Sequence, residues 1–392
     1  MMYSFEQIKQ FAKAQYEWAV ETRRQLHRIP EPGFREEKTK ALIKAKLDEI
    51  GLEYEAPDGG WITAYISGNH PGRITALRAD FDALPIEEPE TCPFRSEHRG
   101  YMHACGHDMH TAIMLATGRL LKSLPDGFSG GCLLMFEPAE ENEGGAKPMA
   151  ESGMLERYHV DRVYGLHVMP RLVVGQVESR YGALNASTDS LRFTVKGVGS
   201  HGAYPENGKD AIVCAGYLVN ALQSIVSRNV SPLDSAVITI GTVKGGSASN
   251  IICDEVTMTG TLRCADKQLR SLLKRRIREC CEGVGKAFGC EITEEISEGY
   301  CALINSDEHV KRILDCASQI CDKDNLLLKD APSMGAEDFS YFIDRVPGAF
   351  FHIGCSSSKE HIGAPLHSRD FCPDERAMEY GIAMETALTV TE

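Results

Sequence analysis

The chain has 392 residues, of which 43% are hydrophobic and 25% charged, and this composition is typical of a globular protein with two or three domains. Its formal net charge of −14 argues against nucleic acid or an anionic membrane surface as a partner. We find no apolar run of transmembrane length and no signal peptide, so we expect a cytoplasmic protein whose cysteines are reduced thiols.

The first part of the chain alternates helices with buried strands. Residues 5–50 carry apolar side chains at helical spacing, and Gly51 is expected to end the second helix. Three strands and one apolar helix follow, the helix at 108–124 and the strands at 73–82, 132–136 and 162–166. This order predicts an α/β domain with a mixed, largely parallel sheet and helices on both faces.

The pattern then changes to alternating strands with two long helices. The strands are predicted at 191–197, 236–243, 255–263 and 291–296, and the helices at 211–227 and 268–288. A buried strand at 348–354 marks the return of the first pattern. We therefore expect a catalytic domain formed by residues 1–183 and 299–392, interrupted by a smaller α+β domain at 184–298.

The segment at 103–110, His-Ala-Cys-Gly-His-Asp-Met-His, contains a thiol, three imidazoles and a carboxylate. Three further groups of metal donors follow it, namely Glu140 with Glu141, His167, and His367. Such side chains bind zinc, manganese, nickel or cobalt, and four separated groups are too many for one closed structural site. Several of them follow predicted strands, where sites in parallel sheets lie. The residues alone therefore favour a metal-dependent hydrolase.

Two simpler interpretations compete with this one. The segment 103–110 could be a helix cap with incidental histidines, and Glu140 with Glu141 could be an acidic surface loop. Adjacent carboxylates in a loop can diverge, however, so that one holds a metal while the other accepts a proton from water. On that basis Glu141 is expected to be a ligand and Glu140 the base.

In their order along the chain, these motifs resemble the dinuclear metallopeptidase superfamily of aminoacylases and carboxypeptidases. The best match is the amidohydrolase branch that includes hippurate hydrolases, auxin-conjugate hydrolases and N-acetyl-diaminopimelate deacetylases. The resemblance runs nearly end to end, through 24–33, 77–85, 103–110, 136–141, 165–167, 199–203, 245–250, 334–339 and 366–367.

The resemblance implies two divalent metal ions per subunit, with Mn, Zn, Co or Ni as candidates. The implied ligands are Cys105, His107, Glu141, His167 and His367. It also implies that Glu140 is the catalytic base and that the inserted domain is a lid and dimerisation domain of a homodimer.

The inserted domain would also contribute to the site. His201 of the partner subunit would stabilise the oxyanion of the tetrahedral intermediate. Asn250 and Arg263 would bind the substrate carboxylate.

The chain departs from the wider pattern at three places. Asp80-Phe81-Asp82 replaces a His-x-Asp metal motif, so Asp82 is expected beside the ligands rather than among them. Cys105 stands where relatives outside the branch have a bridging carboxylate, and Glu206 where the branch often has a second histidine. The last change is expected to affect substrate preference.

The expected reaction is hydrolysis of the amide of an N-acetyl or N-aroyl amino acid to a carboxylic acid and a free amino acid. One alternative is dipeptidase or carboxypeptidase action at the same metal centre. Another is a non-catalytic metal-binding protein on the same scaffold, against which the complete set of Glu140, Glu141 and the other ligands argues.

Overall fold

The computed structural model describes residues 3–142 and 144–391, and the chain divides into two compact units. The first unit comprises Met1–Gly182, Ile304–Asp330 and Asp338–Glu392, and the second Ala183–Leu303 and Ala331–Glu337. From the sequence, residues 331–337 are expected in the catalytic domain. They fall in the second unit because the backbone of Ser333 exchanges hydrogen bonds with Leu184 and Ala186.

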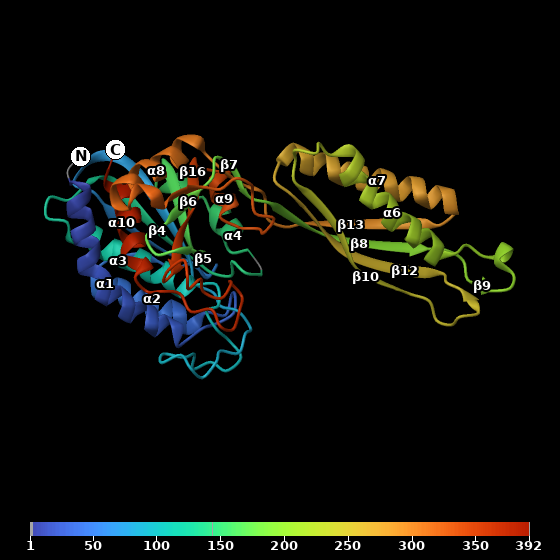
Figure 1. Ribbon diagram of the computed structural model, residues 1–392, viewed down its shortest axis with the longest axis horizontal. Helices are drawn as coiled ribbons and strands as arrows, with labels where there is room; N and C mark the ends of the chain where they lie inside the picture. Colours follow the sequence, from blue (N-terminus) through green and yellow to red (C-terminus); the bar gives the residue numbers. More distant parts are fainter. Residues whose placement is uncertain (1–2, 143, 392) are drawn as a thin grey trace. The chain divides into compact units, whose positions relative to one another are not determined.

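The first unit is built on an eight-stranded sheet (Figure 1). In spatial order its strands are β1 (Tyr54–Glu55), β2 (Ile62–Ser67), β4 (Ser129–Glu137), β3 (His70–Asp80), β5 (Arg162–Val173), β16 (Gly348–Ser356), β6 (Val177–Ser179) and β15 (Leu326–Leu328). The central pairs β4–β3, β3–β5 and β5–β16 are parallel, whereas β1–β2, β2–β4 and β16–β6 are antiparallel. The predicted mixed, largely parallel sheet is confirmed.

Helices cover both faces of this sheet, as Figure 1 shows. On one side α1 (Phe5–His27), α3 (His107–Ser123), α8 (Asp307–Ile320) and α10 (Ala377–Val390) pack together, with α2 (Glu37–Ile50) against α3. On the other side α4 (Ala146–Glu151) packs with α5 (Met154–Arg157) and α9 (Ser340–Ile343). Gly51 ends α2 in a left-handed conformation that glycine adopts without strain, as predicted.

The register of the central strands brings their carboxyl ends level with one another. Asp80, the last residue of β3, pairs with Glu137, the last residue of β4. On the other side of β3, Arg78 pairs with Gly165 of β5. The prediction that β5 ends before His167 is wrong, because β16 continues to pair with β5 beyond that point, with His352 opposite His167. His167 still lies beside the end of β3, two residues beyond the last β3–β5 pair.

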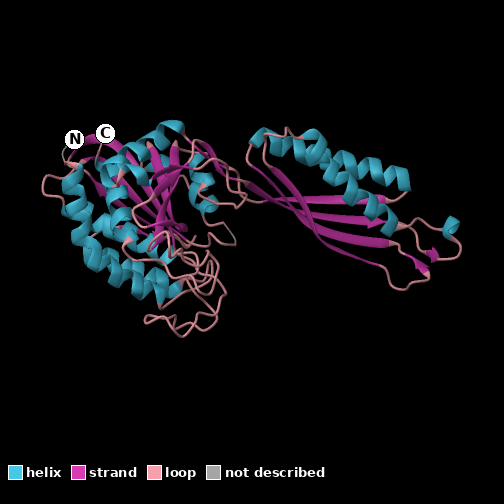
Figure 2. Ribbon diagram, viewed as in Figure 1, coloured by secondary structure: helices cyan, strands magenta, loops and turns pink. Residues whose placement is uncertain are grey.

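The second unit is an antiparallel sheet covered by two helices (Figure 2). The strands occur in the order β10 (Ala236–Gly245), β12 (Glu255–Cys264), β8 (Ser187–Lys196) and β13 (Glu291–Glu298). The helices α6 (Ala211–Asn229) and α7 (Lys267–Phe288) bury apolar side chains against the sheet, and together they form a separate core. Two short strands, β9 (Ser200–His201) and β11 (Ile251–Ile252), pair with each other.

One expectation from the sequence needs correction. By length and composition alone, the 19 residues of α6 could cross a membrane. The core helix of a soluble protein passes the same test, and here Cys214, Leu218, Leu222 and Ile225 of α6 are buried in the core of the second unit.

Candidate metal centre

The turn at 105–107 places a thiol and an imidazole next to each other at the start of α3. Gly106 has φ +92°, and a Cβ there would lie 2.4 Å from Cγ2 of Val168, so only glycine fits without a shift. Cys105 and His107 on either side are both buried. The glycine between these two donors is therefore required by the close approach of β5.

The predicted metal ligands of the first unit lie close together. Sγ of Cys105 is 3.3 Å from Nε2 of His167, and Oε1 of Glu141 is 3.2 Å from Nε2 of His367. Nε2 of His107 lies 3.9 Å from the same Glu141 oxygen. Donor atoms of Cys105, His107 and His167 fall within 4.8 Å of one another, and so do those of Cys105, Glu141 and His367. The fold thus joins donors from 103–110, β5 and two loops.

The loop after β4 brings both adjacent glutamates into the donor cluster. Ala139 has φ +57°, a conformation uncommon for residues other than glycine, and its backbone N–H donates to Glu36 at 3.0 Å. Glu140, which follows, is buried and has a donor atom within 4.8 Å of donors from His107 and Glu141. Both carboxylates therefore belong to the cluster, which does not fit the interpretation of this loop as a solvated acidic surface segment.

Carboxylates of the β3 end hold two of the histidines in place. His107 Nδ1 lies 3.0 Å from Oδ1 of Asp82, and His110 Nδ1 lies 2.6 Å from Oδ1 of Asp80. His110 uses its other nitrogen to accept a hydrogen bond from the Val168 backbone at 2.9 Å. Both nitrogens of His110 are thus engaged by protein groups, whereas Nε2 of His107 is not hydrogen-bonded within the described residues.

The charges of the cluster are strongly coupled. Burial lowers the pKa of His167 well below its usual value, and His110 adds to this effect. Burial would also lower the pKa of His107, but Asp80 and Cys105 beside it raise that pKa well above the usual value. Burial and the charge of Glu141 raise the pKa of the Cys105 thiol. Cys105 therefore needs a nearby cation to become a thiolate.

The residues present fit a pair of divalent cations. The buried atoms His107 Nε2 and Glu141 Oε1 have no aligned hydrogen-bond partner within the described residues, although each lies near a further donor. Buried polar atoms without such partners are costly unless an ion or water satisfies them. One thiol, three imidazoles and a carboxylate suit zinc, manganese, cobalt or nickel.

The residues predicted in the second unit do not form one cluster. His201 is exposed in β9, with Nδ1 accepting the Ala203 N–H at 3.1 Å. Asn250 lies beside it, since its carbonyl accepts the Gly202 N–H at 2.8 Å. Arg263 lies at the opposite end of the sheet, where Nη1 donates to the Met334 carbonyl at 3.0 Å. Within this unit His201 and Asn250 meet, and Arg263 does not join them.

Sequence reasoning gave no role to a buried charge network behind the site. Arg78 donates to Glu137 at 2.7 Å, to Asp80 at 2.5 Å and to Asp338 at 2.9 Å, and all four side chains are buried. Asp338 also accepts the backbone N–H of Ala146, just after the loop that carries Glu140 and Glu141. The available signal was an arginine within the mostly apolar run at 74–79.

A second network anchors the start of α3. Asp108 accepts from Nε of Arg23 at 2.8 Å and pairs with Nδ1 of His27, also at 2.8 Å. The other nitrogen of His27 lies 2.9 Å from Glu88. His27 of the segment 24–33 thus supports the start of α3, although no residue of that segment was predicted to bind metal.

The chain was compared with known proteins. The model of peptidase family M20/M25/M40 matches residues 76–390. An N-acetyldiaminopimelate deacetylase of Brevibacillus brevis is 38% identical over 93% of this chain and 95% of its own length. Thermostable carboxypeptidase 2 of Saccharolobus solfataricus is 35% identical over 98% of both chains.

A solved structure shows the same fold. It is a Bacillus subtilis protein named as a dinuclear metal-binding peptidase of the M20 family, and it is 30% identical to this chain with a TM-score of 0.84. The match covers 96% of this chain and 98% of the other.

Proposed function

The chain belongs to peptidase family M20/M25/M40, and on this premise we propose that it is a metal-dependent amidohydrolase that releases free amino acids from N-acyl amino acids. The observation that carries the proposal is the cluster of Cys105, His107, Glu141, His167 and His367 around the buried Glu140. A deacetylase of N-acetylated diaminopimelate among the relatives supports an N-acetyl amino acid as the substrate class.

Two divalent ions would be held by Cys105, His107, Glu141, His167 and His367. Such a pair supplies Lewis acidity that polarises a carbonyl and acidifies water. Asp82 keeps Nε2 of His107 directed at the cluster because it engages Nδ1. Manganese, zinc, cobalt and nickel all remain candidates, because the thiol and imidazoles suit each of them.

Glu140 is the proton carrier in this proposal. Its carboxylate accepts a proton as water attacks the amide carbonyl and delivers that proton to the nitrogen of the departing amine. Its burial supports this role, because it keeps the carboxylate away from bulk water. Its position beside Glu141 and His107 puts it within the donor cluster.

The second unit would act as a lid and as the contact of a homodimer. Ile212, Val213 and Tyr217 on α6 and Val243 on β10 are exposed apolar side chains, which supports a contact with another chain. His201 of the partner subunit would donate a hydrogen bond to the oxyanion. Asn250, which lies beside His201 in its own subunit, would bind the substrate carboxylate.

Arg263 would bind the substrate carboxylate together with Asn250. A carboxylate-binding role would require it to exchange its hydrogen bond with the Met334 carbonyl for one with substrate.

A carboxypeptidase or dipeptidase activity is the second candidate, and the similarity to thermostable carboxypeptidase 2 favours it. Both reactions cleave an amide next to a carboxylate-bearing residue and would use the same metals and Glu140. They differ in whether the group on the other side of the amide is an acyl chain or an amino acid. Both would take place in the cytoplasm, in line with the reduced thiols expected there.

The test is hydrolysis of N-acetyl amino acids, N-benzoyl amino acids and dipeptides by metal-stripped protein refilled separately with Mn, Zn, Co and Ni. We expect activity to return with at least one metal and to be highest on an N-acyl amino acid. Faster cleavage of dipeptides would favour the second candidate. No hydrolysis across the panel with two ions bound per chain would overturn both.

A further inference from the structure

A cavity of about 770 Å³ lies in the first unit, away from the metal centre. It is lined by α8 and by the beginnings of β3 and β5, through Arg73 and Arg162. The metal donors of these strands lie at their other ends, beyond Asp80 and at His167. The cavity is therefore at the amino-terminal edge of the central strands, and the proposed reaction does not use it.

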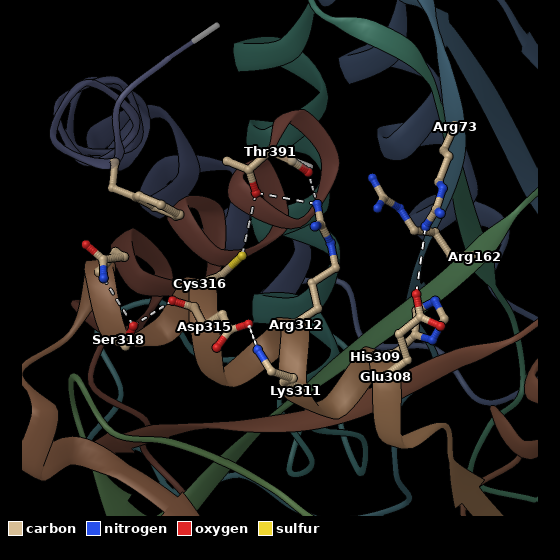
Figure 3. Close-up of a pocket in the computed structure, with 12 residues that line it drawn as sticks. Arg73, Arg162, Glu308, His309, Lys311, Arg312, Asp315, Cys316, Ser318 and Thr391 are labelled. Carbon is tan, nitrogen blue, oxygen red and sulfur yellow. Dashed lines mark hydrogen bonds and ion pairs between the residues drawn. The ribbon is translucent and has the colours of Figure 1, made fainter. Parts of the chain in front are cut away.

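Four cationic side chains line this cavity, and two of them have carboxylate partners. Arg73 pairs with Glu308 at 3.9 Å and Lys311 with Asp315 at 2.5 Å, and all four of these side chains are exposed. Figure 3 shows both ion pairs, together with Arg162 and Arg312. These two pairs compensate their own charges and leave no excess.

Arg162 and Arg312 have only neutral partners within residues 3–142 and 144–391. Arg162 is 3% exposed, and it donates from Nε to the Thr75 hydroxyl at 2.8 Å and from Nη2 to the Thr389 carbonyl at 3.5 Å. Nη2 of Arg312 donates to the Leu388 carbonyl at 3.1 Å and contacts Thr391. A guanidinium is always charged, so the cavity wall carries two positive charges without a described counterion.

Two polar atoms near the cavity also lack hydrogen-bond partners in the described part of the chain. Nε of Arg312 and the hydroxyl of Tyr164 are buried without a hydrogen-bond partner within the described residues. Tyr164 is two residues from Arg162 on β5, and its ring lies 5.7 Å from that of His309, which lines the cavity. Burial lowers the pKa of Arg162, and the positive charges of Arg312 and Arg73 lower it further. Buried, mutually repelling charges are costly unless an anion joins them.

From this arrangement we propose that the cavity is a binding site for a phosphate group, either free phosphate or the head of a small phosphate monoester. Arg162 and Arg312, which have no carboxylate partner among residues 3–142 and 144–391, match the charge of one phosphate, which is about −1.5 to −2 at neutral pH. A guanidinium carries five N–H donors, so each arginine keeps donors for the phosphate oxygens besides those that bind Thr75, Leu388 and Thr389. The cavity is larger than a single phosphate ion, so it leaves room for the rest of a monoester.

Calorimetric titration of the metal-loaded protein with inorganic phosphate, glycerol phosphate and malonate tests this proposal. Arg162→Met and Arg312→Met should each weaken phosphate binding about tenfold or more, because each removes charge-assisted hydrogen bonds. The matched control is the double variant Lys311→Met with Asp315→Asn, which removes both charges of a compensated ion pair in the same cavity and should leave the affinity unchanged. Tighter binding of glycerol phosphate than of phosphate would identify a monoester as the ligand.

Several results would overturn the proposal. They are absence of phosphate binding to the unaltered protein, equal affinity in the arginine variants, and tighter binding of malonate than of phosphate. Phosphate held by the metal centre would give equal affinities in all variants and would disappear when the ions are removed.

The Arg162→Met variant lacks a buried charge, so its melting temperature in phosphate-free buffer should not be lower than that of the unaltered protein. If the Arg162→Met protein does not fold, the phosphate affinity of the Arg312→Met variant tests the proposal, because Arg312 is partly exposed.

Discussion

Asp82 and His107 form a carboxylate–imidazole pair at 3.0 Å, and the opposite nitrogen of the same ring faces Glu141 at 3.9 Å. The second oxygen of Asp82 accepts the backbone N–H of Glu141 at 3.1 Å. One carboxylate thus orients two predicted ligands at once. This is the arrangement expected for a residue that stands behind a metal ligand and fixes its tautomer.

Asp82→Asn is therefore expected to weaken metal binding about 10- to 100-fold, because the amide cannot fix His107 in the same way. Competition with a chromogenic chelator measures the effect. Asp58→Asn is the control, since Asp58 is exposed on a loop. An unchanged affinity would show that Asp82 does not support His107.

Glu140→Gln should lower kcat about 10²- to 10⁴-fold while both ions stay bound, because the amide cannot accept a proton. Activity and metal content are measured on the same sample. Glu151→Gln, which changes an exposed glutamate of α4, is the matched control and should be fully active. Substantial turnover by this variant would show that Glu140 is not the catalytic base.

The proposed role of His201 across a dimer predicts complementation. His201→Ala and Glu140→Gln should each be nearly inactive alone. A mixed dimer regains one complete site, because one chain supplies Glu140 and the other supplies His201. Equal co-expression should therefore restore roughly a quarter of the normal activity. If the mixture stays as inactive as its parents, His201 does not act on the partner's site.

Glu385 on α10 should make stability depend on pH. Burial raises its pKa from 4.5 to about 8, although the hydrogen bond from Thr117 opposes this. Between these two values the unfolded chain has released the proton while the folded chain keeps it, so this contribution to stability is full below about pH 4.5 and falls as pH rises toward 8.

Glu385→Gln should remove this loss of stability at high pH. It should raise the free energy of unfolding at pH 8 by on the order of 2 kcal/mol, with little change at pH 4.5. Urea unfolding at both pH values measures it. Glu379→Gln on the same helix is the control. A variant that is less stable than the unaltered protein at pH 8 would contradict the protonated state of Glu385.

Much of the fold followed from local patterns. Helical spacing located α1 and α2, and Gly51 marked the end of α2 because glycine tolerates the left-handed conformation found there. Runs of apolar residues located β3, β4 and β5, but not the true end of β5. That end depends on pairing with β16, which is almost two hundred residues away in the chain. Where the end of a strand depends on a partner that is distant in the chain, the neighbouring residues do not predict it.

The type of chemistry proposed for the site could be predicted from the sequence, because the donors of the Cys-Gly-His turn and of the Glu140-Glu141 pair lie at short spacing along the chain. Which buried charges have partners became visible in the folded chain alone. Arg78 binds Asp338, which is 260 positions away in the chain. Arg162 and Arg312 line the same cavity and have no carboxylate partner among the described residues. The free energy of a buried charge depends on the groups around it in space, and no local pattern of residues encodes those groups.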